Sequence, residues 1–533
     1  MIDTIFRIAF TVLASAVLTG ASFKMFQIFQ LSGYRTRGVY NWFKATKLDY
    51  LARYFALGFL SFIAIFVFIG SFGSFPITYY IGSFIFFGLC AMFILISFKS
   101  GAQSKTPLKL TKRVWRLIIT SAILHAALVY GLLMFGTLLP KIDYAFACVA
   151  AFLIPFTVTA AHYILLPIEI LIQNSFKKQA AQKLSQNPQL IKIGITGSFG
   201  KTTAKNIVAA MLEKKYKVYA TPASYNTPMG IAKSVNSGGL QDAQVFVAEM
   251  GARYVGDIAE LAHIVKPQYG ILTGIGTQHL ETMGSGENIA KTKYELIESL
   301  PNSGCAFFNG DNEKSVELFT GCTKEKILCG AETVSGASVT YKNAKMQNKG
   351  SVFTLIADGR EIEITTVLLG KHIPGLIALC AAAALKLEVS LEEIAAACAE
   401  LKPVPHRLQL IDRGDTLILD DAYNANAEGA RNALEVLSQL DGTRIIITPG
   451  LVELGEAETE ANIQLGRDIA QFADYAILNS SRGAHIKKGC LEGGMNAEKI
   501  LLTSSLNEAM ERVSEIQGKK VILFENDLPD NLK

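Results

Sequence analysis

One short stretch of the chain has residues suited to holding phosphate groups. Residues 196–203 read Thr-Gly-Ser-Phe-Gly-Lys-Thr-Thr, after an apolar run and before a helix-like run. Small residues let backbone N–H groups approach phosphate oxygens, and the start of the next helix adds partial positive charge. In such loops the lysine reaches the outer phosphates and the following hydroxyl holds Mg²⁺. The stretch predicts binding of ATP and Mg²⁺ by Gly197, Ser198, Gly200, Lys201, Thr202 and Thr203.

The glycine spacing differs from that of the common phosphate loop. That loop has a glycine five residues before its last one, where this chain has Ile195. The form found here, Thr-Gly-x-x-Gly-Lys-Thr-Thr, resembles the loop of ATP-dependent amide ligases. A chance glycine turn is the alternative, but strand-like and helix-like runs flank the loop on the sides that phosphate binding requires.

The chain is too apolar for an ordinary soluble protein, and the apolar excess lies in its first third. Over the whole chain, half of all residues are hydrophobic and 18% are charged, and the mean hydropathy is +0.30. A helix needs about 20 apolar residues to cross a bilayer. We therefore predict about five membrane spans. A cleaved signal peptide is the alternative for the first, but its basic start is weak and further spans follow. The spans are expected within residues 9–23, 54–72, 77–98, 117–139 and 144–172.

The placement of Lys and Arg predicts the orientation of these spans. Basic residues concentrate within 24–53, 99–116 and 177–183, and the other two connections are nearly uncharged. Basic loops face the cytoplasm, so we expect a multi-pass protein of the cytoplasmic membrane with the ATP module inside. These loops account for the net charge of +5 without a nucleic-acid partner. The eight cysteines show no paired metal spacing and are expected to be reduced.

The remaining sequence predicts a multi-domain protein. A transmembrane helical module (1–175) and a linker (176–190) precede a P-loop α/β domain (191–404) and a Rossmann-like α/β domain (405–533). A β-rich segment is expected at 334–366 and an alanine-rich helix at 375–401. Further strands are expected at 191–195, 245–248, 270–273, 305–308, 416–419, 444–448, 474–479 and 520–525.

Polar residues follow several of these expected strands. Glu249 and Asn309 directly follow expected strands of the first α/β domain, and His279 stands in the segment to which the expected strand 270–273 leads. Ligands of open α/β sheets bind beyond the carboxyl ends of strands. A carboxylate is a hard oxygen ligand suited to Mg²⁺. A lone Glu is more often solvated and a lone His more often a structural hydrogen-bonding group. Their joint placement beside the phosphate loop favours a metal site.

These motifs together resemble the Mur ligase family, the ATP-dependent ligases that build the peptidoglycan stem peptide, and most closely its MurF-like members. The resemblance covers roughly residues 190–530. The matching residues lie in 196–203, 225–230, 249–251, 279–281, 291–296, 309–312, 406–407 and 420–426.

The resemblance implies a role for each matching residue. It makes Lys201, His279, Lys293 and Arg407 the expected catalytic residues, with Lys201 on the transferred phosphoryl group. Lys293 matches a lysine that the family carbamylates, and Lys291 is a competing alignment. The expected Mg²⁺ ligands are Thr202, Glu249, His279 and the modified Lys293. The expected nucleotide contacts are Asn309 near adenine, and Arg407, Asp421 and Tyr423 on domain closure.

The implied activity is ATP-dependent amide-bond formation through an acyl phosphate, joining a cell-wall peptide donor to an amino acid or dipeptide. Three features depart from the family pattern. Gly370-Lys371-His372 is followed by Ile373 where the family commonly has Asn, and the Asp-Asn-Pro-Arg acceptor motif is absent. A membrane module also stands in place of the UDP-sugar-binding domain, which suggests a lipid-linked or polymeric donor.

Two other functions fit parts of the sequence. Membrane spans with a phosphate loop would suit an ATP-driven transporter, although His125 and His162 are its only polar intramembrane candidates and each is expected to be a packed histidine. The departure at Ile373 would suit a nonenzymatic ATP-binding scaffold. The retained Lys201, Glu249 and Lys293 argue against the scaffold.

Overall fold

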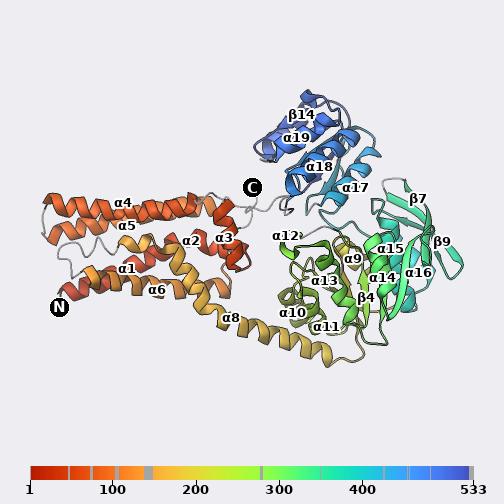
Figure 1. The fold of residues 1–533 in the computed structure, drawn as a ribbon, viewed down its shortest axis with the longest axis horizontal. Helices are drawn as coiled ribbons and strands as arrows, with labels where there is room; N and C mark the ends of the chain where they lie inside the picture. The colour runs from red at the N-terminus through yellow and green to blue at the C-terminus, as the bar shows by residue number, and fades with distance from the viewer. Residues whose placement is uncertain are drawn as a thin grey trace. The chain divides into compact units, whose positions relative to one another are not determined.

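A computed structural model describes residues 2–45, 49–72, 76–102, 107–136, 148–276, 280–347, 350–423, 426–452, 454, 457–479 and 482–526 (Figure 1). Contacts between residues divide the chain into two compact units, Met1–Gln173 and Asn174–Leu528.

The first unit is a bundle of helices around an apolar core. Helix α1 packs against α5 and α6, and α4 packs against α5. Phenylalanine, leucine and alanine side chains from several helices form one buried cluster. The elements are α1 (Ile2–Ala21), α2 (Phe23–Leu31), α3 (Thr36–Ala45), α4 (Asp49–Phe72), α5 (Pro76–Ala102), α6 (Lys112–Gly136), the 3₁₀ turn η1 (Cys148–Ala151) and α8 (Ile154–Ser185).

Three helices in the described part of the chain are long and apolar enough to cross a membrane. They are Thr4–Ala21, Lys112–Phe135 and Ile154–Ser185, at the first, fourth and fifth expected spans. Helices α4 and α5 lie at the second and third and contain 24 and 27 residues. The helical nature of this unit is thus confirmed, and the count of five spans stays a prediction.

The local structure of this unit differs from the predictions in two places. The fifth span was expected to begin at residue 144, but α8 begins at Ile154 after η1, with Pro155 in its first turn. Proline suits the first turn of a helix because the N–H it lacks has no partner there. The basic stretch 24–53, expected as a loop, contains helices α2 and α3.

The two histidines of the helical unit are packed as expected. The His125 ring has no exposed surface. Its Nδ1 lies 3.0 Å from the hydroxyl of Thr19, and its Nε2 lies 2.8 Å from that of Thr157. The His162 ring lies 5.1 Å from that of Phe29. His125 therefore joins three helices, because each of its nitrogens has a hydroxyl partner.

The second unit contains two α/β domains, each built on one sheet. The first sheet has the order β2-β3-β1-β4-β5-β6-β7-β8-β9. It is parallel from β2 to β7, and β8 and β9 add an antiparallel extension at the expected β-rich segment. Strands β1 and β3 are buried along nearly their whole length, as expected where helices cover both faces.

The strands of this first domain are β1 (Ile191–Thr196), β2 (Val218–Ala220), β3 (Val245–Glu249), β4 (Tyr269–Leu272), β5 (Cys305–Asn309), β6 (Glu325–Ala331), β7 (Val339–Gln347), β8 (Gly350–Ala357) and β9 (Arg360–Thr366). Its helices are α9 (Lys201–Leu212), α10 (Pro228–Asn236), α11 (Asp257–Val265), α12 (Leu280–Met283), α13 (Gly286–Glu298), α14 (Glu313–Gly321), α15 (Ile373–Lys386) and α16 (Leu391–Glu400).

The second sheet has the order β10-β11-β15-β12-β13-β14 and is parallel except at β10. Its strands are β10 (Gln409–Asp412), β11 (Thr416–Asp421), β12 (Thr443–Thr448), β13 (Tyr475–Leu478), β14 (Ile500–Leu502) and β15 (Lys520–Glu525). The helical elements around it are α17 (Ala427–Ser438), α18 (Glu458–Phe472), α19 (Gly483–Glu492), η3 (Ala497–Lys499) and α20 (Leu506–Glu515). The α/β predictions are confirmed for both domains.

Two expected segments have a different extent. The single helix expected at 375–401 is divided into α15 and α16, because Glu388 adopts a positive φ and Ser390 begins a new helix with a capping box. The expected linker is largely helical, since α8 continues to Ser185. Ala180 and Leu184 of that helix are buried in an apolar cluster of the second unit.

Candidate active site

The phosphate loop connects β1 to α9, and its two glycines hold conformations that few other residues adopt. Gly197 has φ +153°, and a Cβ there would lie 2.1 Å from Thr273 Oγ1. Gly200 has φ +74° and caps α9. Ile195, at the position of the usual first glycine, is a buried residue of β1. The unusual spacing therefore reflects a strand that continues closer to the loop.

Lys201 begins α9 with its ammonium group folded over the loop. Its Nζ donates to the carbonyl oxygens of Gly197 at 2.8 Å and Ser198 at 3.2 Å. Burial lowers the pKa of Lys201 to about 8; the Glu249 carboxylate opposes this shift and Arg407 adds to it. The ammonium group thus lies where backbone N–H groups and a helix start also favour an anion.

Glu249 ends β3 and is almost completely buried beside the loop. Its Oε1 accepts hydrogen bonds from Thr202 Oγ1 at 3.1 Å and Asn226 Nδ2 at 3.0 Å. Lys205 Nζ lies 3.3 Å from Oε2 as an ion-pair partner, although among the described residues Oε2 accepts no well-formed hydrogen bond. Burial of an under-satisfied carboxylate oxygen is costly, so Glu249 is prepared for a further cation.

These groups fit the magnesium ion that the sequence predicts. The Thr202 hydroxyl and the Glu249 carboxylate are hard oxygen donors, and they are in contact with each other. Within the described ranges, no three His, Cys, Asp or Glu side chains form a metal cluster. His279, the third expected ligand, lies outside the described residues.

The structure distinguishes between the two competing lysines of α13. Lys293 is buried and Lys291 is exposed. Burial lowers the pKa of Lys293 to about 7; the positive charge of Lys201 lowers it further, while Asp257 and Glu295 raise it. Lys293 therefore lies within the electrostatic influence of the loop lysine, and its lowered pKa favours the uncharged state, in which an amine can react with CO₂.

The other loop and strand-end residues have mainly local partners. Ser198 Oγ donates to the Gly276 carbonyl oxygen at 3.3 Å. Asn309 Nδ2 donates to the Thr273 carbonyl at 2.8 Å, and Asn309 Oδ1 accepts from the N–H of Asp311 at 3.0 Å. Asn309 thus holds the ends of two neighbouring strands together. Its expected contact with adenine, and the nucleotide role of Thr203, stay predictions.

Sequence reasoning did not assign a role to two residues of this site, Lys205 and Asn226, which both contact Glu249. Lys205 stands four residues after Lys201 and therefore on the same face of α9. From that spacing alone, Lys205 could have been predicted to lie near the phosphate loop. Asn226 comes from the segment before α10, and no pattern of residue types indicates its distance from Glu249.

The segment that enters the C-terminal domain holds Arg407 in a defined position. His406 and Leu408 on either side have φ of 60° and 49°. His406 Nδ1 lies 2.8 Å from Asp420 Oδ2, and the Arg407 guanidinium carbon lies 4.3 Å from the Tyr423 ring centroid. Because the charge of Arg407 lowers the pKa of Lys201, the structure brings these two expected catalytic residues into one electrostatic neighbourhood.

Two carboxyl groups, the half-buried Asp421 and the fully buried Glu525, lie at the ends of neighbouring strands in this domain. Asp421 of β11 pairs in register with Glu525 of β15. Burial raises the pKa of Asp421 to about 6, although the Leu408 N–H bonds its Oδ1 at 3.0 Å. Burial and then the charge of Asp421 raise the pKa of Glu525, and in the part of the chain that the structure describes neither of its oxygens has a hydrogen-bond partner. Two adjacent carboxyls in a poorly solvated place cannot both ionise readily, which raises the pKa of each.

The turn at Gly370–His372, where the sequence departs from the family pattern, contacts α17 of the C-terminal domain. The Lys371 N–H donates to Asn432 Oδ1 at 3.2 Å, and Asn432 Nδ2 lies 3.0 Å from His372 Nδ1. Lys371 Nζ also lies 2.9 Å from Glu435. This turn therefore connects the two α/β domains in the structure.

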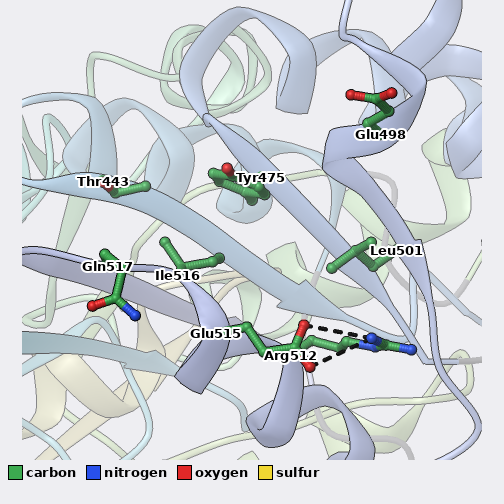
Figure 2. Close-up of a pocket in the computed structure, with 8 residues that line it drawn as sticks. All are labelled: Thr443, Tyr475, Glu498, Leu501, Arg512, Glu515, Ile516 and Gln517. Carbon is green, nitrogen blue, oxygen red and sulfur yellow. Dashed lines mark hydrogen bonds and ion pairs between the residues drawn. The ribbon is translucent and has the colours of Figure 1, made fainter.

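A separate hollow of about 410 Å³ lies near the amino ends of strands of the second sheet, and Figure 2 shows the residues that line it. Thr443 and Tyr475, which line it, are the first residues of β12 and β13. Arg512 and Glu515 form an ion pair at its rim. Ligands of open α/β sheets bind at the carboxyl ends of strands, so this hollow is distinct from the candidate active site.

Known proteins match this chain in both α/β domains. The Mur ligase middle domain matches residues 195–385, and the Mur ligase glutamate ligase domain matches residues 406–525. A UDP-N-acetylmuramoyl-tripeptide--D-alanyl-D-alanine ligase of Mycobacterium leprae is 33% identical over 370 residues, which is 62% of this chain and 70% of that protein.

Other similarities agree with these. The enzyme of the same name from Mycobacterium tuberculosis is 35% identical over 284 residues, which is 52% of this chain; the chain spans only about half of that relative, 55% of its length. A crystal structure of MurF ligase from Thermotoga maritima in complex with ADP is 25% identical with a TM-score of 0.60, covering 67% of this chain and 80% of that one.

Proposed function

The chain belongs to the Mur ligase family, and from that premise we propose that it is an ATP-dependent amide ligase of cell-envelope synthesis. The observation that carries the proposal is the group formed by Lys201, Thr202, Glu249 and Lys293, with Arg407 close enough to affect the loop lysine. The relatives named above add D-alanyl-D-alanine to a UDP-linked tripeptide, so a dipeptide acceptor is the first to test.

The proposed reaction has two steps. A carboxylate oxygen of the peptide donor attacks the γ-phosphorus of ATP, the bond to the ADP oxygen breaks, and an acyl phosphate forms. The acceptor amine then attacks the carbonyl carbon, phosphate leaves with the bonding electron pair, and the nitrogen loses a proton. Positioning and neutralisation of charge account for most of the catalysis of phosphoryl transfer.

Different residues of the chain would serve different parts of this reaction. The loop N–H groups and Lys201 would hold the phosphates, since Lys201 already lies over the loop. Thr202 and Glu249 would hold Mg²⁺, which supplies positive charge against the phosphate oxygens. A carbamylated Lys293 would present a carboxylate where its buried amine now lies near Lys201. Asn226 and Lys205 keep Glu249 oriented.

The second α/β domain would complete the site. Arg407 is fixed by its stacking on Tyr423 and by the His406–Asp420 contact on one side. A rigid guanidinium group suits the recognition of phosphate oxygens. Closure of the domains would exclude water from the acyl phosphate, which water would otherwise hydrolyse.

We propose in addition that the helical unit anchors the enzyme in the cytoplasmic membrane and presents it to a lipid-linked donor. Three apolar helices of sufficient length support the anchoring. The placement of basic residues supports a cytoplasmic active site. A donor embedded in the same membrane would reach the site by two-dimensional diffusion.

The proposal can be tested with purified full-length protein in detergent, ATP, Mg²⁺ and D-alanyl-D-alanine. UDP-linked and lipid-linked tripeptide donors are compared by phosphate release and by the mass of the product. We expect a product that contains the dipeptide and depends on Lys201, with the lipid-linked donor preferred. Absence of a ligated product with both donors and with a set of other amino-acid acceptors would contradict the ligase assignment. A clear preference for the UDP-linked donor would contradict the lipid-linked assignment alone.

A further inference from the structure

The helical unit contains one charged cluster in which two arginines share a single buried carboxylate. Arg116 Nε lies 2.6 Å from Oε1 of Glu169, and Arg113 Nε lies 3.4 Å from Oε2. The Glu169 side chain is 5% exposed, whereas the two arginine side chains are 26% and 31% exposed. The carboxylate is therefore inside the bundle and the arginines reach its surface.

The arrangement leaves the outer edge of each guanidinium group available. Both arginines meet Glu169 through Nε, and in the described part of the chain no hydrogen bond to their terminal nitrogens occurs. The carbon of the Arg113 guanidinium also lies 3.7 Å from the ring centroid of Tyr34, which fixes its plane. A planar guanidinium with a free edge matches the paired oxygens of a phosphate.

The cluster lies where a phosphate-bearing lipid would present its headgroup. Arg113 and Arg116 occupy the first two turns of α6, whose amino end carries partial positive charge. Trp115 beside them is half exposed, as are aromatic residues at the membrane–water boundary. Glu169 is about 22 Å along α8 from Ile154, which is most of a hydrocarbon thickness of about 30 Å.

The overall charge of this unit agrees with an anionic partner. Residues 1–173 contain fourteen Lys and Arg against four Asp and Glu. Since one carboxylate is shared by two arginines, the cluster keeps a net positive charge. The buried Glu169 therefore orders the arginines without neutralising both of them.

We propose that Arg113 and Arg116, positioned by Glu169 and Tyr34, form a binding site for the phosphate group of a membrane lipid. The inference rests on the proposed membrane location of this unit. It extends the proposed function, because a lipid diphosphate that carries the peptide donor has the matching headgroup chemistry. Ordinary anionic phospholipids share that chemistry and are the other source of the ligand.

The test is equilibrium binding to the purified full-length protein in nanodiscs of neutral lipid, without ATP. A short-chain polyprenyl diphosphate and a short-chain phosphatidylglycerol are the two probes, and Trp115 fluorescence is one readout. We expect saturable binding of at least one probe, and the tighter probe identifies the source. Arg116→Gln should weaken binding about tenfold, the effect of losing one charge-assisted pair.

Matched variants separate a built site from general attraction to positive charge. Lys112→Gln removes the same charge from the exposed neighbouring side chain and should change affinity less than about threefold. Glu169→Gln makes the unit more positive, yet should weaken binding because the arginines lose their common partner. Arg116→Lys keeps the charge, is the variant least disturbing to folding, and should also weaken binding because it loses the planar edge.

Equal losses for Arg116→Gln and Lys112→Gln, tighter binding by Glu169→Gln, or unchanged binding by Arg116→Lys would overturn the proposal. Saturable binding of neither probe would overturn it as well. Because no ATP is present, these results are independent of the ligase assay. A protein that binds lipid phosphate without ligating peptides would contradict the proposed function and leave this site standing.

Discussion

The two α/β domains place ionisable groups at the same topological position but with opposite charge. Near the strand ends of the first sheet, Lys201 and Lys205 lie beside the carboxylate of Glu249, and Lys293 lies within the electrostatic influence of Lys201. At the strand ends of the second sheet, the half-buried Asp421 lies beside the buried Glu525.

The difference between the two ends shows what the fold determines and what the side chains determine. A parallel sheet delivers residues to its carboxyl edge, and the residues delivered there define the chemistry. Burial lowers the pKa of the lysines and raises the pKa of the acids, because it disfavours the charged form of each group. A ligand of opposite charge would favour the charged form again. The first cluster suits phosphate, and the second favours a bound proton.

The largest effect on activity is expected when the loop lysine, Lys201, is removed from the first cluster. Lys201→Ala should lower the rate of product formation about 10³-fold, because the γ-phosphate loses its closest cation. Lys214→Ala, which changes a half-buried lysine that pairs with Glu400 just beyond the end of α9, is the control. The measurement is steady-state phosphate release at saturating donor. A loss below about tenfold would mean that the loop does not bind the reacting phosphate.

The second prediction compares two lysines of α13. Lys293→Ala should lower activity about 10²-fold, because the site loses the buried amine that, in the proposed function, would become an additional carboxylate. Lys291→Ala should leave activity nearly unchanged, since Lys291 is exposed. Both variants are assayed by product mass after CO₂ removal and again with added bicarbonate. Equal effects of the two substitutions would contradict the assignment of Lys293.

The acidic cluster gives a prediction about pH. The folded-state pKa of Asp421 is raised to about 6 and that of Glu525 is raised as well. The folded state therefore binds more protons than the unfolded state, and stability should fall as pH rises from about 4 to about 7. Glu525→Gln removes one of the two competing acids and should stabilise the protein by roughly 2 kcal/mol at neutral pH.

Thermal unfolding of the unit that contains the two α/β domains, measured in the full-length protein from pH 4.5 to pH 7.5, checks this prediction. The variant should show the larger gain at the higher pH. Glu515→Gln, which changes an exposed acid of the same domain, serves as the control. A gain that is independent of pH, or destabilisation at neutral pH, would show that Glu525 is not held in its protonated form by Asp421.

The smallest effect is expected from a residue that only orients the metal ligand. Asn226→Ala removes one of two hydrogen bonds to Glu249 Oε1 and should raise the Mg²⁺ concentration needed for half-maximal activity about fivefold. The maximal rate at saturating Mg²⁺ should be retained. Binding of Mn²⁺ followed by electron paramagnetic resonance gives a second readout. An equal loss at all Mg²⁺ concentrations would assign Asn226 a different role.

The sequence was sufficient to predict features that depend only on neighbouring residues in the chain. The loop at Gly197–Gly200 could be located because positive φ and close backbone approach both require glycine. The strand ends carrying Glu249 and Asp421 could be predicted because apolar runs stop there. Predicting these positions requires no information about segments distant in the chain.

The sequence was insufficient where a site depends on segments distant in the chain. Asn226 reaches Glu249 across 23 positions, and Glu525 reaches the end of β11 only through sheet pairing. The break at Glu388 was missed because alanine-rich composition favours a helix on both sides of it. The shared carboxylate of Arg113 and Arg116 lies 53 residues beyond Arg116, so charge counting identified a basic loop and not a site.

The most direct test of the central claim follows an oxygen atom. The donor peptide is prepared with ¹⁸O in its reacting carboxylate, and the released inorganic phosphate is analysed by mass spectrometry. The proposed acyl phosphate predicts that one ¹⁸O atom moves from the donor into each phosphate, with the remaining label in the new amide. Ligated product accompanied by phosphate without ¹⁸O would contradict attack of the carboxylate on the γ-phosphorus and with it this account of the site.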